Sequence, residues 1–324
     1  MQRILVALGG NAIKQSDEQG TTEDQLRNCE TTAKLLAQIF RGLKDDGRLV
    51  ITHGNGPQAG NLLVQQEMGK SVVPAHPMDV VGAMTQGQIG YMLQQTLANN
   101  LADLGIMTPI CTVITRVLVD KDDPEFASDN ASKPVGEFFT EDQAAELKRT
   151  YPEYIVKKVK PTGERAWRRV VPSPDPVEIL EKDALRKMVD EGIIVIASGG
   201  GGIPVVAEQG SYRGVEAVID KDLAGEILAE VIGADLFLVL TDVDKVKLNF
   251  GKPDEKEIDE MTLEQAERYM EQGHFLPGSM GPKVKACIRF LKWGGKLAVI
   301  TSLDKATQAL SNQAGTRIYK KEKQ

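Results

Sequence analysis

The chain consists of short apolar runs separated by longer segments in which apolar residues recur at helical intervals. Such runs are typical of buried strands, and a spacing of three or four residues is typical of helices that pack on one face. The expected strands lie in 3–8, at the start of 48–63, and in 107–115, 191–206, 234–244 and 296–302. The expected helices lie in 21–45, 222–232, 262–272 and 282–293. This alternation predicts an α/β fold, a three-layer αβα sandwich with a central, mostly parallel sheet.

The segment from about Asp120 to Pro176 interrupts the alternation. It is polar and rich in proline, so "DKDDPEFASDNASKPVG" cannot be a core strand, and "GERAWRRVVPSPDP" is typical of a short exposed strand and turn. A disordered surface loop would explain the polarity, but such loops are poor in aromatic residues. This segment contains Phe138, Phe139, Tyr151, Tyr154 and Trp167. We therefore expect residues 120–176 to be an ordered subdomain that protrudes from the main fold.

Length and charge narrow the possible functions. With 324 residues the chain can form one large α/β domain, or one domain with an appendage. The formal net charge of −7 provides no general basic face, so we expect no nucleic-acid partner. No apolar run approaches the roughly 20 residues of a membrane span, and no signal peptide precedes Arg3. The three separate cysteines are typical of reduced thiols, and we expect a cytoplasmic protein without membrane contact.

Glycine-rich turns follow three of the predicted strands. They are "GGNA" at 9–12, "HGNGP" at 53–57 and "SGGGG" at 198–202. Glycine allows a sharp turn and lets an anion approach the backbone amides, although glycines at strand ends often serve packing alone. Because the carboxyl ends of parallel strands gather at one edge of the sheet, we expect the three turns to form one anion site.

Three lysines are candidates to neutralise that anion. Lys221 and Lys283 each lie where a predicted helix begins, a position at which a positive charge opposes the helix dipole. Each is either a solvated surface lysine or a cation kept to meet phosphate. Asp222 either orients these lysines or caps its helix. Lys133 precedes a proline in the insertion, and its own sequence context is more typical of a surface residue.

Two common nucleotide-binding motifs are missing from the sequence. There is no GxxxxGK[ST] motif of a P-loop NTPase, and "ALGGNAI" lacks the GxGxxG order of a nicotinamide-binding fold. The chain has only three histidines, and they form no acid–base constellation with other residues. His53 lies in one of the glycine turns, where it could simply shape the backbone.

Several motifs in this order resemble the carbamate kinases of the amino acid kinase fold family. They are "ALGGNA", "THGNGPQ", "NASKPVG", "WRRVVPSP", "ASGGGGIPV", "VIDKD", "LTDVDKV" and "GSMGPKV", and the resemblance extends from residue 3 to about 318. It implies one amino acid kinase domain over 1–324, with a carbamate-binding part at about 1–190 and a nucleotide-binding part at about 191–318. It also implies a homodimer. The chain departs from the wider family at Lys245, where other amino acid kinases commonly have glycine.

The resemblance also implies a reaction and a set of site residues. The reaction is the reversible transfer of a phosphoryl group between ATP and carbamate, which gives ADP and carbamoyl phosphate, with Mg²⁺ carried by the nucleotide. Lys221 and Lys283 would bind the phosphates and Asp222 would orient them. Carbamate and the transferred group would be held by Gly9, Gly10, Asn11, Gly54, Asn55, Gly199 and Gly200, with Lys133 covering them. The nucleotide pocket would comprise Thr241, Asp242, Met280, Gly281 and Pro282 together with the two catalytic lysines, although Met280 could equally fill the core.

Two other functions remain possible at this point. The same fold serves kinases that act on acetylglutamate, glutamate or aspartate, and the acceptor that converts ATP to ADP would discriminate between them. A non-catalytic sensor of nucleotides or phosphometabolites would bind ATP without turnover. The presence of both Lys221 and Lys283 favours an enzyme.

Overall fold

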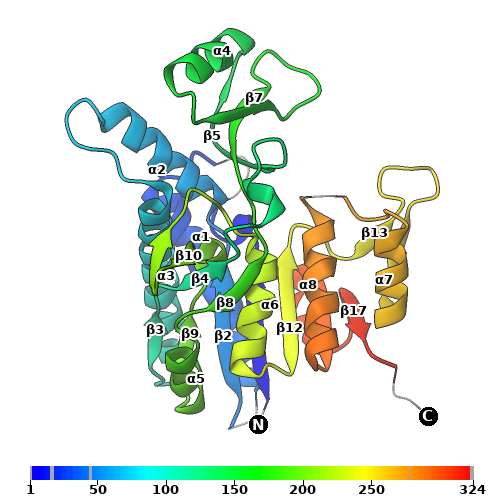
Figure 1. Ribbon diagram of the computed structural model, residues 1–324. Helices are drawn as coiled ribbons and strands as arrows, with labels where there is room; N and C mark the ends of the chain where they lie inside the picture. Colours follow the sequence, from blue (N-terminus) through cyan, green and yellow to red (C-terminus); the bar gives the residue numbers. More distant parts are fainter. Residues whose placement is uncertain (1, 15–17, 44–45, 277, 322–324) are drawn as a thin grey trace.

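A mostly parallel sheet forms the centre of the molecule. The computed structural model describes residues 2–14, 18–43, 46–276 and 278–321 (Figure 1). Within these residues eight strands lie in the order β15-β17-β16-β12-β1-β2-β9-β3. β17 runs antiparallel to β16 and parallel to β15, and the remaining neighbours pair in parallel. The strands are β1 (Arg3–Leu8), β2 (Arg48–His53), β3 (Ile110–Thr112), β9 (Ile194–Ile196), β12 (Leu236–Thr241), β15 (Glu260–Thr262), β16 (Leu297–Ser302) and β17 (Thr316–Tyr319).

Helices cover both faces of this sheet, as the sequence predicts. The helices of the described residues are α1 (Thr22–Gly42), α2 (Gly56–Gly69), α3 (Met78–Asp103), α4 (Glu141–Thr150), α5 (Lys182–Asp190), α6 (Lys221–Ile232), α7 (Leu263–Glu271), α8 (Met280–Trp293) and α9 (Ala306–Leu310). Of these, α4 packs on a separate small sheet and not on the central one. In β1, Ile4, Val6 and Leu8 pack in one apolar core with α1 and α3. Leu5 and Ala7 pack in the opposite core with α6 and α8. A strand buried on both faces has to be apolar at every position, which explains the continuous run in the sequence.

Two adjacent helices, α6 and α8, lie side by side on one face of the sheet (Figure 1). Phe290 of α8 is fully buried, and its ring centroid lies 5.7 Å from that of Phe237 in β12. α6 begins after Asp220, whose carboxylate accepts the N–H of Asp222, and ends at Gly233 with φ +64°. These contacts fix the amino-terminal ends of both helices at the edge of the sheet where the strands end.

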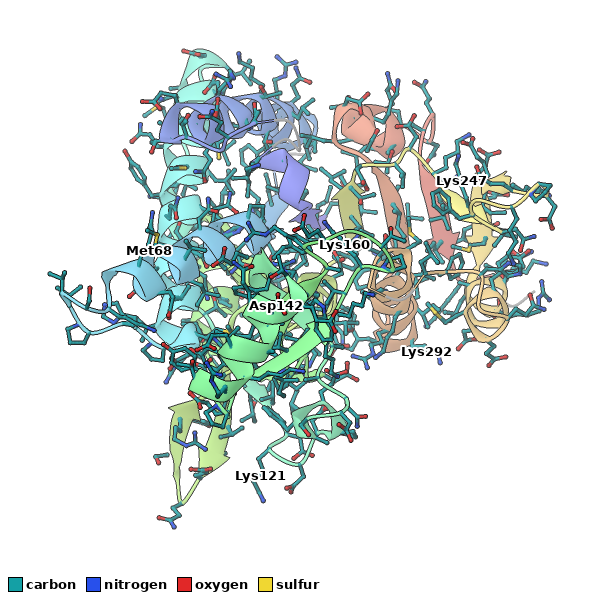
Figure 2. All side chains as sticks on the ribbon, turned by 90° about the horizontal axis from the view of Figure 1, so that it is seen from above. Met68, Lys121, Asp142, Lys160, Lys247 and Lys292 are labelled. Atoms are coloured by element: carbon teal, nitrogen blue, oxygen red, sulfur yellow. The ribbon has the colours of Figure 1, made fainter. Side chains whose placement is uncertain are left out.

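The predicted insertion contains a small unit of its own. β5 (Lys133–Phe139), β7 (Trp167–Val171) and β6 (Ile155–Lys158) form an antiparallel sheet with α4 beside it, and we call these four elements the projecting unit. It stands above the carboxyl ends of the central strands (Figure 1). From above, Asp142 of α4 lies over the middle of the molecule, whereas Lys247 and Lys292 lie to one side (Figure 2). The boundaries 120–176 stay a prediction.

The prediction that "GERAWRRVVPSPDP" forms an exposed strand is wrong in one respect. β7 is the central strand of its sheet, and Val170 and Val171 are 3% exposed. The aromatic residues of the unit pack against one another and against cations. The rings of Tyr151 and Tyr154 stack at 4.9 Å, and the Arg169 guanidinium lies 3.9 Å from the Tyr154 ring. These contacts give the projecting unit a small core, although its sequence is mostly polar.

Two further strand groupings complete the description. β11 (Ser211–Gly214), β10 (Ile203–Glu208), β4 (Arg116–Val119) and β8 (Pro176–Ile179) form a separate sheet, and β13 (Val246–Leu248) pairs with β14 (Lys256–Ile258). Residues 191–206, expected as one strand with a glycine end, therefore divide between β9 and β10, which belong to different sheets. None of the helices in the described ranges has the length and hydropathy that a membrane crossing requires.

Candidate active site

Four neighbouring strands, β12, β1, β2 and β9, end at one edge of the central sheet. The three predicted glycine turns follow β1, β2 and β9. Gly10, Gly54 and Gly200, one from each turn, line a cavity of about 310 Å³ that we name the central cavity. Folding of the sheet thus brings together three turns that are far apart in the sequence.

Glycine is required at several of these positions because other atoms occupy the space of a side chain. A Cβ on Gly9 would lie 2.9 Å from the Leu240 carbonyl oxygen of the neighbouring strand. One on Gly54 would lie 3.2 Å from Cδ of Lys221, so this turn leaves room for the lysine side chain to cross it. One on Gly199 would lie 2.4 Å from the His53 ring, which places Gly199 against that histidine and outside the lining of the central cavity.

The third turn has an unusual backbone. Ser198, Gly200, Gly201 and Gly202 all have positive φ values, and that of Ser198 is +55°. A non-glycine residue in this conformation is strained, and such strain is concentrated at functional sites. The Ser198 side chain is fully buried, and its Oγ atom has no hydrogen-bond partner among the described residues. Across Ser198, Gly199 and Gly200 the sign of φ alternates, and a backbone that alternates in this way is typical of anion-binding turns.

Lys221 and Lys283 meet at a single carboxylate. Lys221 Nζ lies 2.5 Å from Asp222 Oδ1, and Lys283 Nζ lies 3.2 Å from Asp222 Oδ2. The lysine side chains are 16% and 15% exposed, whereas that of Asp222 is 2% exposed. The buried carboxylate therefore holds both ammonium groups in place. Both lysines line the central cavity.

The charge of Asp222 is maintained against its burial. Burial alone raises the pKa of the Asp222 carboxyl, but the ammonium groups of Lys221 and Lys283 outweigh it and hold the pKa below its ordinary value. The carboxylate is therefore ionised at neutral pH. Asp222 also lies in the first turn of α6, where a negative charge is favourable to the helix dipole.

Lys133 reaches the same region from the projecting unit. It is the first residue of β5, and its Nζ lies 3.1 Å from Oδ2 of Asp220, the residue that caps α6. Lys133, Asp220, Lys221, Asp222 and Lys283 all line the central cavity. Three lysines and two aspartates leave this cavity with one positive charge in excess, which suits an anionic ligand.

A second cavity adjoins the first across the two lysines. It measures about 570 Å³ and is lined by Gly9, Thr241 and Asp242, among others, and we name it the side cavity. Gly10, Lys221 and Lys283 line both cavities. Two ligands, one in each cavity, would therefore meet at the same pair of ammonium groups.

Not every predicted site residue lines a cavity. Asn55 lines the central cavity, and its amide donates to Thr85 Oγ1 at 2.9 Å. Met280, Gly281 and Pro282 are absent from the linings of both cavities as the described residues define them. Met280 packs against the apolar core that contains residues of α6. Filling the core was the alternative to nucleotide binding for this residue. The side chain of Asn11 lies outside the described part of the structure.

His53 is part of the site's support. Its side chain is 1% exposed, and Nδ1 lies 2.9 Å from the Gly54 carbonyl oxygen. Burial lowers the pKa of His53 to about 4, so the imidazole is neutral at physiological pH. It thus shapes the turn, as the sequence allowed, and adds no charge to the cavity.

Carboxylates that could form a protein-built metal site are not gathered here. In the described ranges, no group of three or more His, Cys, Asp or Glu side chains is placed to hold a metal ion. Mg²⁺ keeps several waters and commonly binds through substrate phosphates, so an ion carried by a nucleotide does not require such a group.

Sequence reasoning missed two residues of this region. Asp220 lies two positions before the predicted helix 222–232 and directly before α6 as it is observed. An aspartate at that place is a standard helix-cap signal, but the sequence does not show that it also binds Lys133. Ser198 precedes the four glycines, and nothing in its sequence context indicates a left-handed backbone. Lys245, the residue at which the chain departs from the family pattern, lines neither cavity. Its Nζ atom lies 2.6 Å from Oδ1 of Asp259.

The chain is similar over nearly its whole length to known kinases. The model of the amino acid kinase family matches residues 2–302. The carbamate kinase of Thermococcus kodakarensis is 51% identical over 322 residues, which are 99% of this chain and 100% of that protein. The carbamate kinase of Clostridium perfringens is 46% identical over 98% of this chain and 100% of its own length. The structure of the Giardia lamblia carbamate kinase bound to AMP-PNP superposes with a TM-score of 0.91 at 40% identity and covers 99% of both chains.

Proposed function

The chain belongs to the amino acid kinase family and, within it, to the carbamate kinases, and from this premise we propose that its site transfers a phosphoryl group between ATP and carbamate. The products in this direction are ADP and carbamoyl phosphate. One observation carries the proposal: Lys221 and Lys283 line both the central and the side cavity. A phosphoryl group that passes from one ligand to the other between the cavities would remain next to both cations.

The chemistry requires alignment more than acid–base catalysis. Carbamate is an anion, so its oxygen can attack the γ-phosphorus without prior loss of a proton. As that P–O bond forms, the bond from the γ-phosphorus to the β-phosphate oxygen breaks, and ADP leaves with the electron pair. Enzymes lower the barrier of this reaction through positioning and charge neutralisation. His53 is buried, and its pKa of about 4 makes the imidazole a weak base, which is consistent with a site that uses no general base.

Each charged residue of the site then has a distinct role. Lys221 and Lys283 neutralise the negative charge on the phosphoryl group in transit, and Asp222 holds both ammonium groups in place. The turns that contain Gly9, Gly54 and Gly200 would bring backbone N–H groups to the anions, with Gly10, Asn11, Asn55 and Gly199 as their neighbours. Lys133 would cover the carbamate or carbamoyl phosphate in the central cavity.

The nucleotide would lie in the side cavity, next to Thr241 and Asp242. Mg²⁺ would come as a complex with the nucleotide phosphates, where it would neutralise part of their charge. Lys221 and Lys283 are the residues of this chain that would share those phosphates with the ion. Of the predicted nucleotide-side residues, Met280, Gly281 and Pro282 contribute through the start of α8, the helix that carries Lys283.

A coupled assay tests the proposal directly. The enzyme is mixed with ADP, carbamoyl phosphate and Mg²⁺, and the ATP formed is measured. We expect ATP only when all three are present, and in the reverse direction ADP formation with carbamate but not with acetylglutamate, glutamate or aspartate. Turnover with one of these amino acids would change the substrate. Tight ATP binding without any turnover would show a sensor instead of a kinase.

The homodimer and the cytoplasmic location stay predictions. Size-exclusion chromatography with light scattering on the full chain measures the molecular mass in solution. A mass of about twice the 35.3 kDa of one chain is expected, and a monomer would contradict the prediction.

A further inference from the structure

The two carboxylate oxygens of Asp220 have different partners. Oδ1 accepts the backbone N–H of Asp222 at 2.9 Å, which caps α6. Oδ2 accepts from the Lys133 ammonium group at 3.1 Å. One side chain thus joins the helix that presents Lys221 and Asp222 to the lysine of the projecting unit.

This ion pair connects two separate parts of the molecule. Its partners are 87 residues apart, one at the start of β5 and the other at the start of α6. The side chain of Asp220 is 15% exposed and that of Lys133 is 34% exposed. A pair that is partly shielded from water is stronger than a fully exposed one. Lysine has a long, flexible side chain, so a fixed partner is needed to give its charge a defined position.

The other carboxylate of the cavity is not available for this purpose. Asp222 is already shared by Lys221 and Lys283. Within the part of the chain that the structure describes, Asp220 is the acceptor for Lys133 Nζ. Loss of the Asp220 charge would therefore leave the Lys133 ammonium group without a partner that directs it toward the cavity.

We propose that Asp220 is a positioning residue that holds the Lys133 ammonium group over the central cavity, where it meets the anionic substrate. The proposal rests on the proposed function, because it assigns carbamoyl phosphate or carbamate to this cavity. Asp220 acts through Lys133 and need not touch the reacting atoms. An ammonium group has three N–H donors, so Lys133 can bind Asp220 and a substrate oxygen at the same time.

The substitution Asp220→Asn separates the two roles of this side chain. Asparagine caps helices as well as aspartate does, so α6 keeps its cap, while the charge that holds Lys133 is lost. We expect the KM for carbamoyl phosphate to rise about 3- to 10-fold while the KM for ADP changes less than about twofold. The melting temperature should stay close to that of the unchanged enzyme. Asp183→Asn, which removes one negative charge in the first turn of α5, is the matched control and should leave both constants unchanged.

A second background shows whether Asp220 acts through Lys133. In an enzyme that already carries Lys133→Ala, the further change Asp220→Asn should no longer raise the KM for carbamoyl phosphate, because the two residues form one unit. An equal rise in both backgrounds would show that Asp220 acts independently, and the proposal would be wrong. A lower KM in the single variant would show that Asp220 competes with the substrate for Lys133, which also overturns it.

The experiment keeps this proposal distinct from the proposed function. If the unchanged enzyme forms no ATP from ADP and carbamoyl phosphate, the function itself fails. If it does so and Asp220→Asn has an unchanged KM, only the role of Asp220 fails. Should Asp220→Asn melt at a clearly lower temperature, Asp220→Ser is measured in its place, since serine also caps helices and carries no charge.

Discussion

The substitution Asp222→Asn tests the centre of the proposed site. It keeps the size of the side chain and replaces a carboxylate, bound to two ammonium groups at 2.5 and 3.2 Å, with a neutral amide. The amide oxygen can still accept from one lysine, but the amide nitrogen is a donor and faces the other. Two positive charges then remain at the site without their common counter-charge.

The magnitude follows from the burial of the group. Two unit charges about 4 Å apart interact by about 4 kcal/mol at an effective dielectric constant of about 20. The cost of burying Asp222, which is 2% exposed, offsets part of that gain in the native enzyme. Removal of one partner from a buried pair typically costs about 3–5 kcal/mol of stability. Because Lys221 and Lys283 keep some access to water, we expect a value near the lower limit, about 3 kcal/mol.

Two assays measure the consequences. Urea unfolding gives the free energy of unfolding of each variant, and ATP formation from ADP and carbamoyl phosphate gives the turnover number. We expect a loss of about 100-fold or more in turnover, since both phosphate-binding cations lose their fixed position. Asp183→Asn, with the same change of charge on α5, should alter neither quantity.

The dependence on pH provides an independent check. The Asp222 pKa is lowered in the folded state, so its contribution to stability is present above the unfolded pKa of 3.8 and is lost as the pH falls through the lower, folded pKa. The difference in stability between the enzyme and Asp222→Asn should therefore shrink in acid. A variant that is as stable and as active as the unchanged enzyme at neutral pH would refute the role given to Asp222.

Three further predictions follow from the same structure. Lys221→Ala and Lys283→Ala should each lower turnover about 100- to 1000-fold while the protein stays folded by circular dichroism, and near-normal turnover in either would remove that lysine from the mechanism. Lys133→Ala should raise the KM for carbamoyl phosphate more than that for ADP in steady-state kinetics, and the opposite pattern would move Lys133 to the nucleotide side. Glu226 is 1% exposed, and burial, followed by its hydrogen bond with Glu230, raises the pKa of Glu226 to about 9. The folded state then keeps a proton that the unfolded state releases, so stability should fall by up to about 1.4 kcal/mol per pH unit as the pH rises from about 4.5 to about 9. Glu226→Gln imitates the neutral acid and should flatten this slope in urea unfolding measured across that range, whereas an unchanged slope would assign the dependence to other groups.

Some elements could not be predicted because their sequence pattern conceals them. α3 spans 26 residues, but it contains Gly82, Gly87 and Gly90, which disfavour a helix by propensity. A Cβ on Gly90 would lie 2.2 Å from the Thr112 side chain, so this glycine allows α3 to approach β3. Residues 107–115 were expected as one strand and yield the short β3, Ile110–Thr112. Tertiary packing decides both cases.

The sequence by itself determined the local features of this protein. Strands buried on both faces need continuous apolar runs, and sharp turns at their ends need glycine, so β1, β2 and the turns after them could be located without a structure. The same is true of the chemical types, lysine and aspartate at the start of α6 and lysine in the first turn of α8. Only the tertiary structure decided that Lys221 and Lys283 share Asp222, and that Lys133 binds Asp220 from another part of the molecule. The physical reason is that hydrophobic periodicity shows which face of a helix is buried but not which helix lies beside it, whereas an ion pair forms only once two charged groups lie within a few ångströms.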